Sequence, residues 1–300
     1  MTIINRNLRH KFRALAGAAV ISGALASLSL PASAKESAAP PATAAERATY
    51  ADLVTLAERS ELVIRAKIRR QTQVSPERAP GLQPGFARLY IEAETQALIA
   101  GNSSIGESLA YLVDVPLTAK GKVPKLKKRE FVLFANAVPG RRSERGAEIQ
   151  LTAKNAQLDY SPQFVERLRP VLTSLARGDV PPRIEGISDA LAVQGTLVGE
   201  SETQVFLATQ DRSPVSLTVL RRPGQEPVWG VSWGEIIDSA ARAPEPETLR
   251  WYRLACSLPG ELPSSANLAR DPAARRLAAA DYRLVVEQLG PCEREITEPA

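Results

Sequence analysis

The chain has 300 residues, with 38 Lys and Arg against 33 Asp and Glu and a single histidine. That histidine, His10, lies in an N-terminal segment, residues 1–34, that also holds four of the basic residues and none of the acidic ones. The rest of the chain has a net charge of +1 and no histidine, which excludes Ser-His-Asp and Cys-His catalysis and removes the main reason to expect a nucleic-acid-binding protein.

Residues 1–34 have the pattern of a secretory signal peptide. Basic residues precede a small-apolar stretch over residues 14–30, and Ala32-Ser33-Ala34 matches the A-x-A pattern of a signal-peptidase site. A retained membrane anchor is the alternative, because a stretch of this length could almost span a bilayer. We predict cleavage near Ala34 and an exported, periplasmic or secreted protein without a stable transmembrane anchor.

A β-rich unit is predicted over residues 50–160, after a disordered Ala- and Pro-rich spacer at residues 35–49. In its first strand, residues 61–71, apolar side chains alternate with Arg65, Lys67 and Arg69, as in a half-buried strand. Further strand patterns follow at residues 87–100, 107–117, 129–138 and 147–161. Five short strands with turns between them predict a small antiparallel barrel, preferably OB-like, or a sandwich.

A connecting helix and linker are predicted over residues 161–183. Ser161 can cap the helix and Pro162 suits its first position. Pro170 lies inside the apolar pattern, so we expect it to kink or split the helix.

The second unit, residues 184–292, is predicted to be α+β, with a short tail at residues 293–300. Its strand patterns form a four-stranded antiparallel meander, at residues 190–199, 202–210, 214–222 and 227–233. Helix patterns follow at residues 235–242, 246–257 and 271–289. All nine lysines lie at or before Lys154, so this unit has only arginine as its basic residue.

The two cysteines, Cys256 and Cys292, both lie in the second unit. An even pair in an exported protein predicts a disulfide, because the compartment is oxidising. A redox-active pair more often has C-x-x-C spacing. Two cysteines without histidine do not supply the ligands of a zinc site, so no metal or other cofactor is expected.

Two tryptophans, Trp229 and Trp233, fall on one face of the last strand. They fill the core under the helices, or they form a stacking platform for sugar rings or aromatic peptides. Burial is the stronger expectation, because each indole can bury on the order of 200 Å².

A strongly basic segment lies between the third and fourth predicted strands and should be a protruding loop. It attracts anionic envelope components, or it is simply a solvated loop. It has no interleaved aromatic residue to stack on nucleic-acid bases. Its six basic residues are Lys120, Lys122, Lys125, Lys127, Lys128 and Arg129.

Two carboxylate pairs could run acid–base chemistry without histidine. Glu92 and Glu94 share one face of the second strand, and Glu235 and Asp238 follow the tryptophan strand. Acidic residues at a helix start are explained equally well by the helix dipole.

The sequence therefore favours an exported, non-catalytic envelope protein that binds another protein or an anionic polymer. Its candidate contacts are the basic loop and the tryptophan strand. The alternatives are a secreted carboxylate-dependent hydrolase acting on polysaccharide, and a structural or chaperone-like exported protein.

Overall fold

The computed structural model describes residues 42–102, 105–143, 146–235 and 241–298. The predicted signal peptide and residues 35–41 of the predicted spacer lie outside them. Residues 42–49, which were expected to belong to the spacer, are part of the compact unit that begins at Ala42. Helix α1 (Ala44–Arg47) begins with a capping box on Thr43, and Ala45 and Ala48 are buried.

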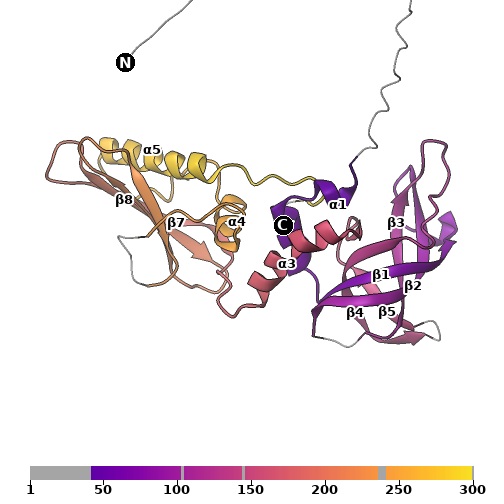
Figure 1. Cartoon of the computed structure of the whole chain (residues 1–300). Coiled ribbons are helices and arrows are strands. Elements are labelled where there is room, and N and C mark those ends of the chain that lie inside the picture. The colour runs from indigo at the N-terminus through magenta and orange to yellow at the C-terminus, as the bar shows by residue number, and fades with distance from the viewer. Residues whose placement is uncertain (1–41, 103–104, 144–145, 236–240, 299–300) are drawn as a thin grey trace, which may run out of the picture. The chain divides into compact units, whose positions relative to one another are not determined.

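The N-terminal β-rich region is a closed five-stranded barrel (Figure 1). Strand order is β1-β2-β3-β5-β4, and β1 also pairs with β4, which closes the barrel. All neighbours are antiparallel except β3 and β5, which are parallel. The strands are β1 (Leu62–Gln73), β2 (Phe86–Gly101), β3 (Ser108–Pro116), β4 (Glu130–Ser143) and β5 (Gly146–Leu151), with a 3-10 turn at Pro76–Arg78.

Alternating side chains fill the barrel as the sequence predicts. Leu62, Ile64 and Ile68 of β1 are at most 2% exposed and pack against Leu89 and Ile91 of β2. Gly146 makes the parallel pair possible, because a Cβ atom there would lie 2.1 Å from the main-chain oxygen of Ser108.

The fifth predicted strand, residues 147–161, is two strands. Strand β5 ends at Leu151 and the short β6 (Gln157–Asp159) pairs with β4. Between them the chain turns, and Ala156 N–H donates to the carbonyl of Ala153.

Helices pack beside the barrel. Helix α2 (Tyr50–Glu58) precedes β1 and contacts α3 (Pro162–Ala176), which lies where the connecting segment is predicted. Ser161 caps α3, which continues through Pro170. Of the two expected effects, a kink or a split, the split is therefore wrong. Pro170 is on the exposed face of α3, where water can bond to the carbonyl that loses its N–H partner.

The C-terminal region is α+β, with a four-stranded antiparallel sheet of order β10-β9-β8-β7. This confirms the predicted meander, although its first strand begins at Ile184 and ends at Gln194 rather than covering residues 190–199. Helix α5 packs against β7 and β8 and contacts α4 (Figure 1). The elements are β7 (Ile184–Gln194), β8 (Ser201–Thr209), β9 (Val215–Arg221), β10 (Val228–Ser232), α4 (Leu249–Ala255) and α5 (Pro272–Leu289).

The predicted helix at residues 235–242 falls largely on residues 236–240, which lie outside the described residues. The other two predicted helices are present as α4 and α5. The Cys256–Cys292 disulfide is also present, with Cα atoms 5.1 Å apart. It joins the C-cap of α4 to the segment just after α5.

Candidate anion-binding site

The second half of the basic segment between β3 and β4 packs on the barrel, whereas the residues near its tip are exposed. Gln71 of β1 fixes it twice: its Nε2 donates to the carbonyl of Pro124, and its Oε1 accepts from Leu126 N–H at 2.6 Å. The Leu126 side chain is 3% exposed and belongs to the barrel core. The loop therefore has a defined path across the barrel wall.

The end of the loop is also paired with β1 through the backbone. Lys128 N–H donates to the carbonyl of Ile68 at 2.8 Å, and Ile68 N–H donates to the carbonyl of Arg129 at 2.9 Å. Lys128 has a φ of 72°, a left-handed conformation that is uncommon for a residue other than glycine. These bonds bring loop residues next to residues of β1 that are about sixty positions earlier in the sequence.

The result is a small cationic cavity of about 370 Å³. We call it the lysine cavity. Its lining residues are Lys67, Ile68, Arg69, Glu94, Lys127 and Lys128. Four of these six lining residues are cationic and one is acidic, and the cations come from two separate segments of the chain.

The single carboxylate of the lysine cavity is already engaged. Arg69 Nε donates to Glu94 Oε2 at 2.9 Å. In the described part of the chain, no carboxylate pairs with Lys67, Lys127 or Lys128. Ammonium groups are compact donors that suit phosphate, sulfate and carboxylate oxygens. The lysine cavity is therefore a candidate anion site.

The remaining basic residues of the loop differ in their roles. Arg129 forms an ion pair with Asp159 of β6. The other three, Lys120, Lys122 and Lys125, are exposed and lie outside the lysine cavity. Near the tip, Thr118 N–H donates to the carbonyl of Lys122, so the tip is a closed turn.

Sequence reasoning identified the loop but missed its β1 partners. Lys67 and Arg69 were interpreted only as the solvent face of a strand. The one local signal is Leu126, an apolar residue among lysines, which indicates that the loop returns to the core. Gln71 gives no such signal, because its contact with the loop spans 53 to 55 positions.

The two tryptophans of the last strand have different environments. Trp229 is 6% exposed, and its Nε1–H donates to Oε1 of Gln288 on α5 at 2.8 Å. Trp229 is a core residue, which confirms the stronger expectation of burial for this indole, so the alternative of a platform formed by both open indoles is wrong. Trp233 follows β10, is partly exposed and lines a separate cavity.

The predicted pair of Glu92 and Glu94 is engaged by arginines. Glu94 pairs with Arg69, and Glu92 lies 3.9 Å from Arg70 Nη1. Both carboxylates are therefore bound to arginines of the neighbouring strand. Glu235 is exposed, and Asp238 lies outside the described residues.

The described residues contain no group of three or more His, Cys, Asp or Glu side chains that could hold a metal ion. None of the helices described is long and apolar enough to cross a membrane.

Comparison with known proteins gives no relative: no family model matches the chain, and no curated protein sequence matches it. The functional argument therefore depends on the site alone.

Proposed function

We propose that the chain is an exported, non-catalytic binding protein whose barrel binds an anionic polymer of the cell envelope at the lysine cavity. The observation that carries this proposal is the backbone pairing of Lys128 and Arg129 with Ile68. It holds Lys127 and Lys128 at the same cavity as Lys67, where the one lining carboxylate, Glu94, is already paired with Arg69. Such a grouping opposes folding, and a bound polyanion relieves the repulsion.

The backbone of Lys128 supports the same proposal. A left-handed conformation costs a non-glycine residue about 1–2 kcal/mol, and glycine would remove that cost while losing the charge. Strained residues often occur at binding sites, where surrounding hydrogen bonds keep them in place. The two bonds to Ile68 have that role here.

The barrel itself is proposed to be OB-like. Its strand order, its closure between β1 and β4, and its parallel β3–β5 pair support this assignment. The loop that carries Lys127 and Lys128 is the connection between β3 and β4. The fold gives no function by itself, so the charge arrangement remains the basis of the proposal.

Export is supported by the sequence of residues 1–34 and by the disulfide. Structural disulfides persist in oxidising compartments and are rare where thiols are kept reduced. Both cysteines of the chain are used in the one bond between Cys256 and Cys292.

The test is a titration of the chain from residue 35 onward with fluorescent dextran sulfate, with uncharged dextran as the reference polymer. We expect binding of dextran sulfate only, and weaker binding at higher salt because exposed charges are screened. Replacing Lys67 and Lys127 together with Gln should lower the affinity about tenfold or more at low salt.

The matched control is Lys154→Gln, which removes an exposed lysine of the same barrel away from the lysine cavity. It should change the affinity by less than about twofold. Equal losses in the control and in the double variant would contradict the proposal, as would equal binding of dextran sulfate and dextran.

A further inference from the structure

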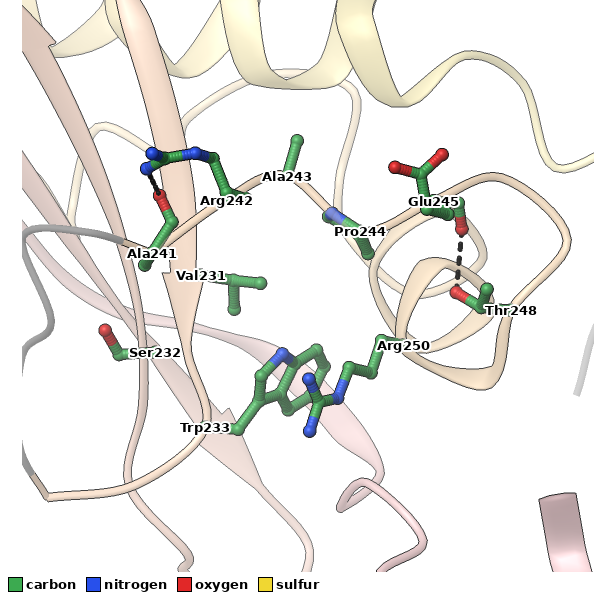
Figure 2. A pocket seen from close by; sticks show the side chains of 10 residues that line it. All are labelled: Val231, Ser232, Trp233, Ala241, Arg242, Ala243, Pro244, Glu245, Thr248 and Arg250. Atoms are coloured by element: carbon green, nitrogen blue, oxygen red, sulfur yellow. Dashed lines mark hydrogen bonds between the residues drawn. The ribbon is translucent and has the colours of Figure 1, made fainter.

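A second cavity, of about 660 Å³, lies between the end of β10 and the start of α4. Cavities of about 300–1,000 Å³ are typical of small-molecule sites. Apolar side chains of Val231, Trp233 and Pro244 line it together with the polar side chain of Arg250 (Figure 2). It has no residue in common with the lysine cavity.

The indole nitrogen of Trp233 distinguishes this cavity. The Nε1 atom is buried, and no acceptor among the described residues bonds to it. The other two tryptophans are satisfied internally: Trp229 donates to Gln288, and Trp251 Nε1 donates to the carbonyl of Leu289 at 2.8 Å. A buried N–H without an acceptor is costly, and it gains most from a ligand that supplies one.

The direction of this N–H is toward the cavity. In Figure 2 the indole nitrogen is on the side of the ring that faces Val231 and the segment Ala241–Glu245. Indole nitrogen is a donor only, so its ligand must offer an acceptor atom.

Arg250 supplies a second donor and the charge. Its side chain is exposed, forms no ion pair with the described residues, and lines the same cavity as Trp233 (Figure 2). Arg253, one turn later on α4, is by contrast paired with Glu58. The one carboxylate among the described lining residues, Glu245, points away from Trp233 in the same view.

We propose that this cavity binds a small monocarboxylate with an apolar body. The carboxylate accepts hydrogen bonds from Trp233 Nε1–H and from the Arg250 guanidinium, which is the strong, charge-assisted kind of pairing. The apolar body contacts Val231, Pro244 and the indole ring. This site is independent of the polymer site proposed on the barrel.

The experiment is a ¹H–¹⁵N NMR titration of the indole N–H signals, on the chain from residue 35 onward, which contains the compact unit that begins at Ala42. The chain has three tryptophans, so Trp229 and Trp251 are internal references with partners of their own. Hexanoate should shift the Trp233 signal saturably and leave the other two in place. Hexanamide, which lacks the charge, and acetate, which lacks the apolar body, should each bind about tenfold or more weakly.

Two variants, compared by calorimetry with hexanoate, test the roles of the donors. Arg250→Gln and Trp233→Phe should each weaken binding about tenfold. Arg276→Gln, which removes an exposed arginine of α5 outside the cavity, should leave binding unchanged. The circular dichroism spectra of all three should match that of the parent chain.

The proposal is overturned if hexanoate moves none of the indole signals or all three equally, or if hexanamide binds as well as hexanoate. It is also overturned if Arg250→Gln folds normally and retains full affinity. A loss of dextran sulfate binding in the lysine variants does not affect either result, because the two sites share no residue.

Discussion

The cations of the C-terminal region and those of the barrel loop differ in what they contact. Arg221 pairs with the fully buried Asp281 of α5 at 2.6 Å. Arg275 donates to the main-chain carbonyls of Asn267 and Ala269. The lysines of the loop have no such partners in the part of the chain that the structure describes. One set of charges maintains the fold, and the other is available to a partner.

The chemistry of the two side chains fits this division. The guanidinium group presents several donors in a fixed plane, which suits buried carboxylates and clustered carbonyls. The ammonium group is strongly hydrated and flexible, so it remains at the surface until a ligand replaces its water. Lysine is confined to residues up to Lys154, so this hydrated and flexible kind of cation occurs in the barrel region and not in the C-terminal region.

The largest effect should follow from removing an arginine that maintains the fold. Arg221→Met leaves the Asp281 carboxylate buried with only the Thr203 hydroxyl as a side-chain partner. Loss of one member of such a pair costs about 3 kcal/mol, read as a lower midpoint in urea unfolding. The neighbouring exposed Arg222 is the control, and Arg222→Met should leave the midpoint nearly unchanged. Equal midpoints for the two variants would contradict the inference that Arg221 maintains the fold and Arg222 does not.

A buried carboxylate near the other end of the unit should give the next largest effect. Asp52 of α2 accepts hydrogen bonds from Glu295 N–H, Thr297 N–H and the Thr297 hydroxyl, and so fixes the C-terminal tail. Asp52→Asn loses the charge that strengthens these bonds and should cost about 2 kcal/mol. Urea unfolding at neutral pH measures this loss of unfolding free energy. The control variant is Asp211→Asn, at a position in an exposed turn.

The same carboxylate gives a pH dependence with a definite sign. Burial alone would raise the pKa of Asp52, but the hydrogen bonds from Thr297, Glu295 and Thr49 outweigh it and lower the pKa below the ordinary value of 3.8. A carboxylate with a lowered pKa stabilises the fold above its unfolded-state pKa, and this contribution is lost as the pH falls through the folded value. Parent and Asp52→Asn unfolding energies should therefore converge in acid; a constant difference down to pH 2 would contradict the assignment.

The tryptophans allow the same comparison with uncharged groups, because one indole N–H has a partner within the fold and the other has none among the described residues. Trp229→Phe removes a satisfied hydrogen bond to Gln288 and should lower the unfolding free energy by about 1 kcal/mol or more. Trp233→Phe removes an N–H that has no acceptor among the described residues, so its cost should be near zero. Thermal unfolding measures both, and a larger loss for Trp233→Phe would reverse the interpretation.

The smallest effect concerns the backbone of the loop. Lys128→Gly removes the cost of the left-handed backbone conformation. Glycine also has more freedom in the unfolded chain, which offsets part of this benefit, so we expect the free energy of unfolding to rise by about 0.5 kcal/mol. Dextran sulfate binding should nevertheless weaken, because one charge is lost. Lys127→Gly, at a position without positive φ, should weaken binding without the gain in stability. A stability loss for Lys128→Gly would show that its side chain, rather than its backbone, is needed for the fold.

Local pattern predicted most of the elements of this fold but few of the contacts that form its sites. Alternation placed Ile64 and Ile68 inside the barrel, and the meander, the C-terminal helices and the Cys256–Cys292 pair were all predictable. The parallel β3–β5 pair was not, because it depends on contacts between residues far apart in sequence. The split of the fifth strand after Leu151 also left no clear pattern.

The candidate sites were harder to predict because they too depend on contacts between residues far apart in sequence. The contact between the loop and β1 is set by backbone bonds to Ile68, which any residue can form. Trp229 and Trp233 share an alternation, but Trp229 lies within β10 under α5, whereas Trp233 lies just past the end of the strand. The position of a strand end relative to a helix is a tertiary property, so identical residues four positions apart have different environments.

The most direct test of the central claim is lysine acetylation read by mass spectrometry, with and without dextran sulfate. We expect the polymer to protect Lys67, Lys127 and Lys128 together, although Lys67 is far from the other two in sequence. Lys154 should remain as reactive as before. Uniform protection of all lysines, or protection of the loop without Lys67, would contradict the lysine cavity as the binding site.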